Sequence, residues 1–236
     1  MLSFIVPAHD EAATIGAVVD AIRAAAGERA HEILVVDDAS TDATAAVATA
    51  AGARVLHVAH RQISATRNAG AKAAAGDVLV FVDADTFIGT DVVAGLEREI
   101  AQGAAGGGAG VRFDEPVPRW VHVALPVALA LFRWLRFTGG CFVFARRADF
   151  EAVGGFDETL YAAEEIALCR ALGRRGRFAI LRETVLTSGR KLRTHSAREI
   201  AWAALRVAFA GRAGVRDRSR LDLWYAPRRE DPGARR

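Results

Sequence analysis

Acidic residues follow two apolar runs of the sequence, each at the point where the run ends. Asp37 and Asp38 come directly after one run, and Asp83 and Asp85 follow another. Carboxylates in such places accept hydrogen bonds from a base or a ribose, and they hold Mg²⁺ or Mn²⁺ against a diphosphate. Helix capping is the alternative and suits Asp42, but it does not explain a pair of carboxylates after each of two runs. We therefore interpret the two pairs as part of a ligand site.

The elements that must position these acids alternate along the first hundred residues. Continuous apolar runs predict strands buried on both faces, and periodic apolar residues between them predict helices. The predicted strands are Leu2–Pro7, Glu32–Val36, Arg54–Val58 and Val78–Val82, and the predicted helices are Ala13–Ala26, Thr41–Ala51 (capped by Ser40 or Thr41), Ile63–Ala75 and Asp91–Gln102. This order predicts a doubly wound α/β sheet, with ligands in the crevice beyond the carboxyl ends of its strands.

The second half of the sequence is less regular. We expect an extended segment at Ala104–Val111, strands at Cys141–Ala145 and Phe178–Arg182, and helices at Arg119–Phe137, Ala148–Val153, Glu164–Arg174 and Ala197–Gly211. No internal repeat and no low-complexity linker interrupts the pattern, which indicates one continuous domain.

The segment Arg119–Phe137 is strongly apolar. It is shorter than the ~20 apolar residues of a membrane span, and Arg133 and Arg136 interrupt its end. Two interpretations stay open: the helix packs on the sheet or forms a wall over an acceptor cleft, or it contacts a membrane where lipid-linked acceptors lie. Of these two, packing is favoured.

The composition is that of an ordinary globular protein. The chain has 236 residues, of which 52% are hydrophobic and 25% are charged, which excludes general disorder and a collagen-like fibre. Cys141 and Cys169 are too few for a disulfide framework and lack the spacing of a zinc site, so we interpret both as packing residues. The start of the sequence does not resemble a signal peptide, so we expect a reducing, cytoplasmic setting.

Basic residues concentrate in the C-terminal part of the chain. From residue 190 onward there are thirteen arginine and lysine residues and five acids, although the whole chain has a net charge of only +3. Phosphate groups or an anionic membrane surface would attract such a segment, and a solvated arginine-rich end is the alternative. The aromatic residues of this part lack the spacing of a stacking platform, so we expect no nucleic-acid partner.

Four motifs, in order, resemble the family-2-type glycosyltransferases of the GT-A fold. They are Val6–Glu11, Val35–Thr44, Arg67–Ala71 and Val80–Asp85, and the likeness continues through Gly154–Glu158 and Glu164–Leu168. An Asp-x-Asp element alone is common by chance, whereas four motifs in the right order are specific. The resemblance covers residues 2–195 and implies a single-domain GT-A (Rossmann-like) α/β fold, with a mixed, mostly parallel sheet flanked by helices.

The resemblance also divides the chain. It implies a glycosyltransferase domain over residues 1–195, with a nucleotide-binding half (1–102) and an acceptor-side half (103–195), followed by a C-terminal basic helix and tail (196–236).

The resemblance assigns a donor pocket to this sequence. Asp38 is expected to contact the nucleotide base, Asp83 the ribose, and Asp85 the metal ion, Mn²⁺ or Mg²⁺, that stabilises the leaving diphosphate. Arg67 is expected to approach the base or phosphate, and a salt bridge to an acid at the end of a strand is its alternative. The residues implied for the nucleotide-sugar are Pro7, Ala8, Glu11, Asp38, Arg67, Asp83, Ala84, Gly140 and Arg190.

The acceptor side begins with two glutamates. The family pattern has Glu-Asp where this chain has Glu164-Glu165, so the resemblance places the general base on Glu165, with Glu164 as helper or fallback. The extra methylene of Glu165 changes the geometry of the base but not its chemistry. The alternative is that both glutamates favour the N-terminal dipole of a helix. His195 is expected as a second metal ligand, and a solvated histidine in a basic loop is its alternative.

The resemblance therefore implies a metal-dependent glycosyltransferase that moves a sugar from a UDP- or GDP-linked donor to an acceptor hydroxyl, with inversion. The acceptor is expected to be a sugar, a lipid or a small molecule. A polyprenyl-phosphate glycosyltransferase is one alternative, since a phosphate acceptor needs no strong base. A non-catalytic nucleotide-binding or membrane-associated partner protein of the same fold is another. Peripheral contact with the inner face of the membrane is a further expectation.

Overall fold

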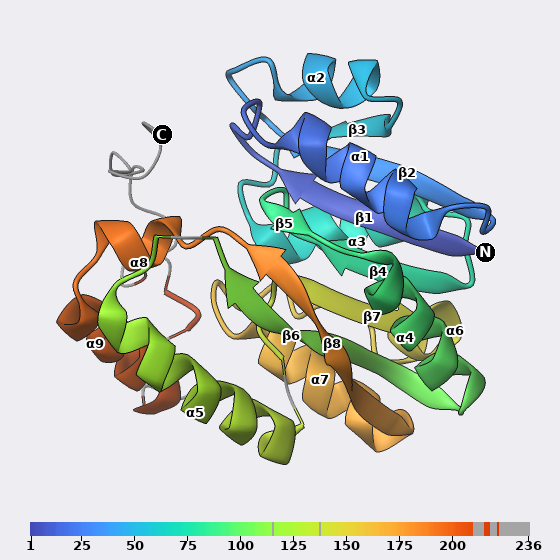
Figure 1. The fold of residues 1–236 in the computed structure, drawn as a ribbon. Coiled ribbons are helices and arrows are strands. Elements are labelled where there is room, and N and C mark those ends of the chain that lie inside the picture. The colour runs from blue at the N-terminus through green and yellow to red at the C-terminus, as the bar shows by residue number, and fades with distance from the viewer. Residues whose placement is uncertain (115, 137, 210–214, 218–220, 222–236) are drawn as a thin grey trace.

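The computed structural model describes residues 1–114, 116–136, 138–209, 215–217 and 221. These residues form one sheet of eight strands with helices on both faces (Figure 1). The strands are β1 (Leu2–Ala8), β2 (His31–Asp38), β3 (Arg54–Val58), β4 (Val78–Val82), β5 (Thr86–Phe87), β6 (Ala104–Phe113), β7 (Phe142–Arg146) and β8 (Arg177–Thr187). The helices are α1 (Ile15–Ala26), α2 (Thr44–Ala50), α3 (Ile63–Ala73), α4 (Thr90–Ala101), α5 (Arg119–Leu135), α6 (Arg147–Ala152), α7 (Glu164–Arg175), α8 (Arg190–Thr194) and α9 (Ala197–Phe209).

The strand order is β3-β2-β1-β4-β7-β6-β8-β5. The pairs among β1 to β4 are parallel, β7 is antiparallel to both β4 and β6, β6 and β8 are parallel, and β5 is antiparallel to β8. The expected α/β fold with a mixed, mostly parallel sheet in a single domain is confirmed. The carboxyl ends of β1, β2 and β4 meet at one edge of the sheet, which is where ligands bind in open α/β sheets.

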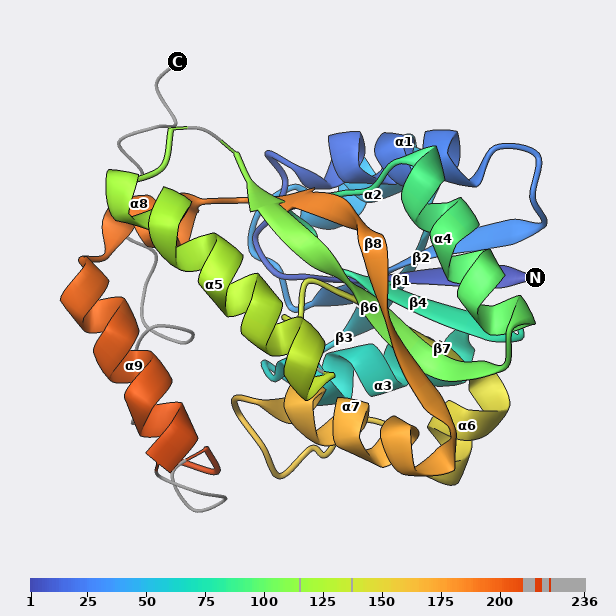
Figure 2. The same cartoon turned by 60° about the horizontal axis from the view of Figure 1, so that its bottom comes forward.

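Side chains that alternate along the central strands build a core on each face of the sheet. On one face Phe4 and Val80 belong to a buried cluster with residues of α1 and α4. On the other, Ile5 and Phe81 belong to a cluster with residues of α3, α6 and α7. Figure 2 shows α1 and α4 on the opposite side of the sheet from α3, α6 and α7. The continuous apolar runs of the sequence are explained by this double burial.

Several elements differ from the expectations. The helix expected from Thr41 begins only at Thr44, whose backbone N–H donates to the Asp42 carboxylate at 2.9 Å. The last strand continues to Thr187, since β6 pairs along it as far as that residue. The short elements β5 and α8 were not expected.

The helix α5 is another difference. Only Val121 of its residues is buried, while Leu125, Leu129 and Phe132 are half-buried, so the helix packs on the rest of the chain through one face only. The predicted end of this helix at residue 137 lies outside the described residues, as does most of the predicted tail after Phe209.

Candidate functional site

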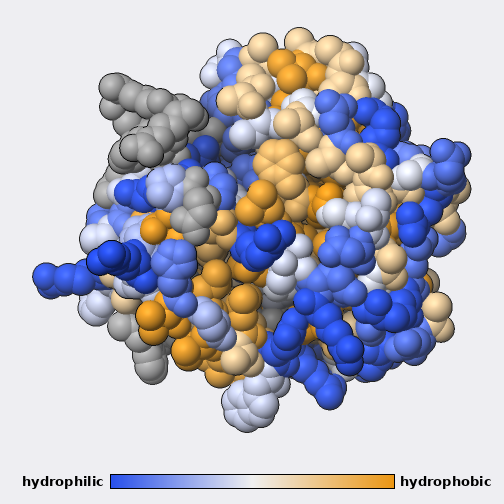
Figure 3. Space-filling view, in the orientation of Figure 1, coloured by the Kyte–Doolittle hydropathy of each residue, from blue (hydrophilic) through white to orange (hydrophobic). Residues whose placement is uncertain are grey.

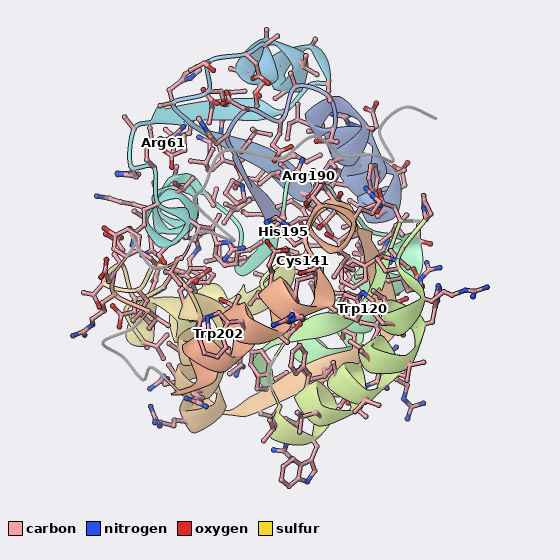
Figure 4. All side chains as sticks on the ribbon, turned by 90° about the vertical axis from the view of Figure 1, so that its left-hand side faces the viewer. Arg61, Trp120, Cys141, Arg190, His195 and Trp202 are labelled. Atoms are coloured by element: carbon pink, nitrogen blue, oxygen red, sulfur yellow. The ribbon has the colours of Figure 1, made fainter. Side chains whose placement is uncertain are left out.

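The candidate site lies where β4 ends beside the start of β7. The Asp83 backbone N–H donates to the carbonyl oxygen of Cys141 at 3.0 Å, and this bond joins the first Asp-x-Asp residue to the glycine segment before β7. Asp83 and Asp85 are both half-buried, and Ala84 between them is buried. Figure 4 looks onto this side of the molecule and shows Cys141, Arg190 and His195 in one central region. The strand ends therefore bring predicted donor residues and predicted acceptor-side residues together.

Arg67 is the buried centre of this region. Its side chain is 2% exposed, and it donates from Nη2 to Asp83 Oδ1 at 2.8 Å and from Nη1 to Glu164 Oε1 at 3.0 Å. Nη2 also donates to the Gly140 carbonyl oxygen at 2.7 Å, and the guanidinium lies over the ring of Phe156, 5.2 Å from its centroid. The structure thus shows the salt bridge that was the alternative for Arg67, because Asp83 directly follows the end of β4. A planar guanidinium presents several N–H donors in a fixed geometry and can bind several acceptors at once, and a lysine ammonium does not offer this geometry.

The residue before Arg67 binds a different segment. Thr66 donates from Oγ1 to Asp38 Oδ2 at 2.7 Å, and Asp38 also accepts the backbone N–H groups of His60, Arg61 and Gln62 at 2.7, 2.8 and 3.2 Å. Burial raises the pKa of Asp38, but the hydrogen bonds to its carboxylate outweigh that effect and hold the pKa below its ordinary value. Asp38 thus organises the loop before α3, and its contact with a nucleotide base stays a prediction.

The residue after Arg67 binds a third segment. Asn68 accepts the Phe156 backbone N–H at 2.9 Å and donates to the Phe156 carbonyl oxygen at 2.9 Å and to Glu158 at 2.8 Å. Successive helical residues point about 100° apart, so three neighbours on α3 reach three different parts of the chain. The predicted motifs at Arg67–Ala71 and Gly154–Glu158 are therefore in direct contact.

Glu164 and Glu165 begin α7, and the residue before them, Ala163, is in the left-handed region with φ of 59°. The Glu164 side chain is 7% exposed and forms an ion pair with Arg67. Burial raises the pKa of Glu165, and the neighbouring charge of Glu164 raises it further, against the opposite effect of Arg67. A Cβ atom added to Gly140 would lie 3.5 Å from both the Glu165 carboxyl carbon and Arg67 Nη2. The predicted base therefore lies at the glycine that was placed beside the donor sugar.

The position of Gly140 depends on β6. Thr138 is buried and donates from Oγ1 to the Ala109 carbonyl oxygen at 3.0 Å. A Cβ atom added to Gly108 would collide with the Thr138 side chain, so glycine at this position lets the segment before Gly140 lie directly on the strand. The glycine-rich sequence of β6 thus sets the wall of the site.

The second aspartate lies among further charges. Burial raises the pKa of Asp85 to about 6, and the charges of Asp83 and Glu11 raise it while those of Arg190 and Lys191 lower it. No hydrogen bond to the Asp85 carboxylate is found within the part of the chain that the structure describes. Half-buried carboxylate oxygens beside other acids form a hard donor set that suits Mg²⁺ or Mn²⁺.

Two basic residues reach the acids through a strand pairing. β5 follows Asp85 directly and pairs with the end of β8, with Thr86 opposite Thr187 and a hydrogen bond of 2.9 Å between their hydroxyl groups. The chain then enters α8, which begins at Arg190. Asp114 holds this turn through Arg193 at 2.9 Å. The pairing therefore carries Arg190 and Lys191 to the Asp-x-Asp segment.

Lys191 follows Arg190 in the basic segment after the last strand, although only Arg190 was assigned to the nucleotide-sugar. Lys191 is exposed, but the protein around its ammonium lowers its pKa. The charges of Asp83 and Asp85 raise the pKa in part, without cancelling that effect. The sequence signal for Lys191 was only its place next to Arg190 after the last strand.

The remaining predicted residues lie around the same strand ends. Pro7 and Ala8 are buried at the carboxyl end of β1, and Glu11 lies 4.0 Å from Arg190 Nη2. His195 follows α8, and its Nδ1 lies 3.0 Å from Thr194 Oγ1 and 3.2 Å from the Lys191 carbonyl oxygen. Among the described residues, no three His, Cys, Asp or Glu side chains form a group that would hold a metal by themselves. The role of His195 as a metal ligand stays a prediction.

Comparison with known proteins places this geometry in a family. The family model described as Glycosyl transferase family 2 matches residues 3–154. A glucosyl-3-phosphoglycerate synthase of Mycolicibacterium paratuberculosis (strain ATCC BAA-968 / K-10) is 34% identical over 162 residues, which cover 52% of this chain and 47% of that protein. The synthase of the same name from Mycolicibacterium smegmatis is 35% identical over 100 residues, 36% of this chain and 30% of that one. The matched part thus spans less than half of these relatives.

Solved structures share the fold. The mannosyltransferase PcManGT from Pyrobaculum calidifontis, in complex with GDP-Man and Mn²⁺, superposes with a TM-score of 0.70 at 18% identity, covering 95% of this chain and 68% of that one. The glucosyl-3-phosphoglycerate synthase from Mycobacterium tuberculosis, in complex with Mn²⁺, UDP and glucosyl-3-phosphoglycerate, gives 0.59 at 24% identity, covering 92% and 81%. TarS of S. aureus in complex with UDP-GlcNAc gives 0.62 at 18% identity, covering 79% and 58%.

Proposed function

The chain belongs to glycosyl transferase family 2, and on that premise we propose that it moves a sugar from a nucleoside-diphosphate donor to an acceptor hydroxyl, with inversion at the anomeric carbon. The observation that carries this proposal is the shared guanidinium of Arg67, which binds the donor-side Asp83 and the acceptor-side Glu164. A reaction between two bound molecules needs both sides held at a fixed separation.

The donor side is formed by the ends of β1, β2 and β4. In this proposal the nucleoside lies over Ala8 and the loop that Asp38 organises, and the ribose lies at Asp83. Support comes from the position of these residues at one edge of the sheet, in the crevice that nucleotides occupy in open α/β sheets. The base and the sugar of the donor are left to experiment, since similar structures hold both UDP-GlcNAc and GDP-Man.

Asp85 would hold the divalent cation, with His195 as a proposed second ligand. When bound, Mg²⁺ or Mn²⁺ stabilises negative charge that develops on a departing diphosphate. Within the described residues no closed group of metal ligands is found, which is consistent with a site that the donor's own oxygens complete. The raised pKa of Asp85, caused first by burial and then by the charges of Asp83 and Glu11, supports this assignment, because a bound cation would compensate the crowded carboxylates.

Arg190 and Lys191 would bind the phosphates directly. Both lie close enough to Asp85 for their charges to affect its pKa, and both come from one short helix fixed by Asp114. A diphosphate that leaves the sugar gains negative charge, and fixed cations beside it favour that change.

Glu165 would act as the general base that removes the proton of the acceptor hydroxyl. A carboxylate with a raised pKa is a better base than an ordinary one, and an optimal catalytic pKa lies near the working pH. Its position beside Gly140, where an added Cβ atom would lie 3.5 Å from the Glu165 carboxyl carbon, supports this role. Glu164 is bound to Arg67, so we assign it to positioning rather than to proton transfer.

Calorimetry with UDP and GDP, each with and without Mn²⁺, tests the donor site. Binding that needs Mn²⁺ and that Asp85→Asn weakens supports the proposal, whereas equally tight binding without the metal contradicts it. A panel of nucleotide sugars then identifies the donor by slow hydrolysis, which needs no acceptor. No hydrolysis and no transfer from a bound donor would favour the non-catalytic alternative. Transfer to a phosphate that does not need Glu165 would favour the polyprenyl-phosphate alternative.

A further inference from the structure

An apolar stripe runs along the outer face of α5. Val123, Val127, Leu131 and Trp134 are spaced four, four and three residues apart, so they share one helical face. Their exposed fractions are 74%, 68%, 48% and 79%. We call these four residues the α5 stripe. Exposed apolar residues on a monomer are normally scattered singly, and an aligned set marks an interaction surface.

The surface around the α5 stripe extends the apolar face. Figure 3, in the orientation of Figure 1, shows hydrophobic residues gathered over α5. In Figures 1 and 2 α9 is the neighbouring helix, and its Trp202 is 64% exposed. Tryptophan is enriched where one end of a side chain is in an apolar phase and the other in water.

The charges of α5 have one sign. The helix carries Arg119, Arg133 and Arg136 and no acid, and the arginines lie at its two ends. Arg133 donates to the Leu181 carbonyl oxygen at 3.0 Å, which fixes the end of the helix to β8. An apolar face with basic residues beside it is typical of helices that lie in the interface of an anionic bilayer.

These observations favour a bilayer over a second copy of the chain as the partner of the α5 stripe. A two-fold interface brings the same patch of both copies together, so stripe-to-stripe contact would bring arginines near arginines with no acid of α5 to pair them. A bilayer with anionic lipids accepts both the apolar side chains and the arginines. No helix in the described part of the chain is long and apolar enough to cross a membrane, so contact through α5 would be along the surface.

We propose that the α5 stripe binds the surface of a bilayer containing anionic lipids, with the helix lying along the interface. The docking itself does not depend on the proposed function. Its consequence for the site is positional, because α5 leads into the segment from Thr138 to Gly140 that forms the wall beside Glu165.

Vesicle sedimentation of the full chain tests this proposal. The wild-type protein is expected to sediment with vesicles of phosphatidylcholine and phosphatidylglycerol, and more weakly with phosphatidylcholine alone. The double variant Val127→Glu and Leu131→Glu is expected to reduce the affinity for anionic vesicles by roughly tenfold or more, because it places two charges in the apolar face. The matched control is Ala94→Glu, which adds a charge at an exposed position of α4.

A second pair of changes separates the basic contribution. Arg119→Gln with Arg136→Gln is expected to weaken binding to anionic vesicles and to leave the weak binding to phosphatidylcholine unchanged. Unaltered thermal unfolding and UDP or GDP binding show that each variant is folded. Failure of the wild-type chain to bind anionic vesicles overturns the proposal, as does equal binding by the stripe variant. A dimer in solution that the stripe variant dissociates, with no vesicle binding, assigns the stripe to a second copy instead.

Discussion

Arg67 and Asp83 form an ion pair with 2.8 Å between Nη2 and Oδ1, in which the arginine side chain is 2% exposed and the aspartate 33% exposed. The same guanidinium binds Glu164, so one buried cation compensates two carboxylates from opposite halves of the site. This arrangement makes Arg67 a determinant of stability and, in the proposed function, a positioning residue for both substrates.

Arg67→Met is expected to lower the free energy of unfolding by about 3 kcal/mol, since it leaves two carboxylates without their partner. The estimate is at the low end for a buried pair because Asp83 reaches solvent. Urea denaturation measures the effect. The matched control is Arg177→Met, which removes a pair with Glu99 whose arginine side chain is 42% exposed, and which is expected to cost under ~1 kcal/mol. Equal losses in the two variants would contradict the central role of Arg67.

Glu165→Gln is expected to lower kcat by roughly 10²–10⁴-fold and to leave the KM for the donor nearly unchanged, because the amide cannot accept the proton of the acceptor. Initial rates with the identified donor and acceptor measure this. Glu151→Gln is the control, since Glu151 lies on α6 in an exposed pair with Arg147. Unchanged turnover in Glu165→Gln removes the base assignment, and a product that retains the anomeric configuration removes the inverting mechanism.

The pH profile of transfer follows from the raised pKa of Glu165. Only the ionised carboxylate removes a proton, so kcat/KM is expected to rise with pH until the pH passes this raised pKa, and then to level. The acid limb of the profile should therefore lie above the ordinary range of a glutamate, which centres near ~4.3. A limb at the ordinary value would argue that Glu165 is not the titrating base.

Asp85→Asn is expected to weaken Mn²⁺-dependent binding of UDP or GDP by about tenfold to a hundredfold, because it removes an anionic oxygen ligand. Calorimetry with the metal present, and again with a chelator, measures the metal-dependent part. Asp91→Asn, at an exposed position in α4, is the matched control. Equal binding in the Asp85 and Asp91 variants would place the cation elsewhere.

Asp38→Asn is expected to lower the free energy of unfolding at pH 7 by about 1–3 kcal/mol, because it weakens the hydrogen bonds that hold the loop before α3. The folded-state pKa of Asp38 is lowered, so its contribution is present above the unfolded pKa of ~3.9 and is lost as the pH falls towards the folded value. Stability of the variant should therefore fall less between pH 4 and pH 2, as measured by denaturation at each pH. Asp20→Asn, at a 70% exposed position, is the control, and an equal effect there would contradict this account.

Much of this fold was predictable because apolar runs and charged residues alternate clearly. The strands β3 and β4 end where their apolar residues end. Acids follow the apolar runs of β2 and β4, and in β2 they are the last two residues of the strand. The last strand was predicted too short because Glu183 interrupts its apolar pattern. In the structure Glu183 lies 3.3 Å from Arg98 of α4, so a contact distant in sequence accounts for the charge.

Side-chain pairing within the site was less predictable. Whether Arg67 binds a phosphate or forms an ion pair depends on where Glu164 lies. Arg67 and Glu164 are 97 residues apart in the chain, so the sequence does not show their contact. Lys191 shares the basic segment after the last strand with Arg190, and the pairing of β5 with β8 is what brings this segment to Asp85. The two interpretations of the α5 segment stayed open because an apolar sequence normally indicates burial, and periodicity alone does not name the phase that an apolar face contacts.

The three successive side chains of α3 have a consequence for motion. Thr66 holds the loop before the helix, Arg67 holds the strand end and the start of α7, and Asn68 holds the segment that begins at Phe156. None of these segments is released from the others while that turn of helix stays intact. Amide hydrogen exchange in the loop before α3, in α3 and around Phe156 should therefore follow one cooperative opening. The two halves of the site would then open and close together.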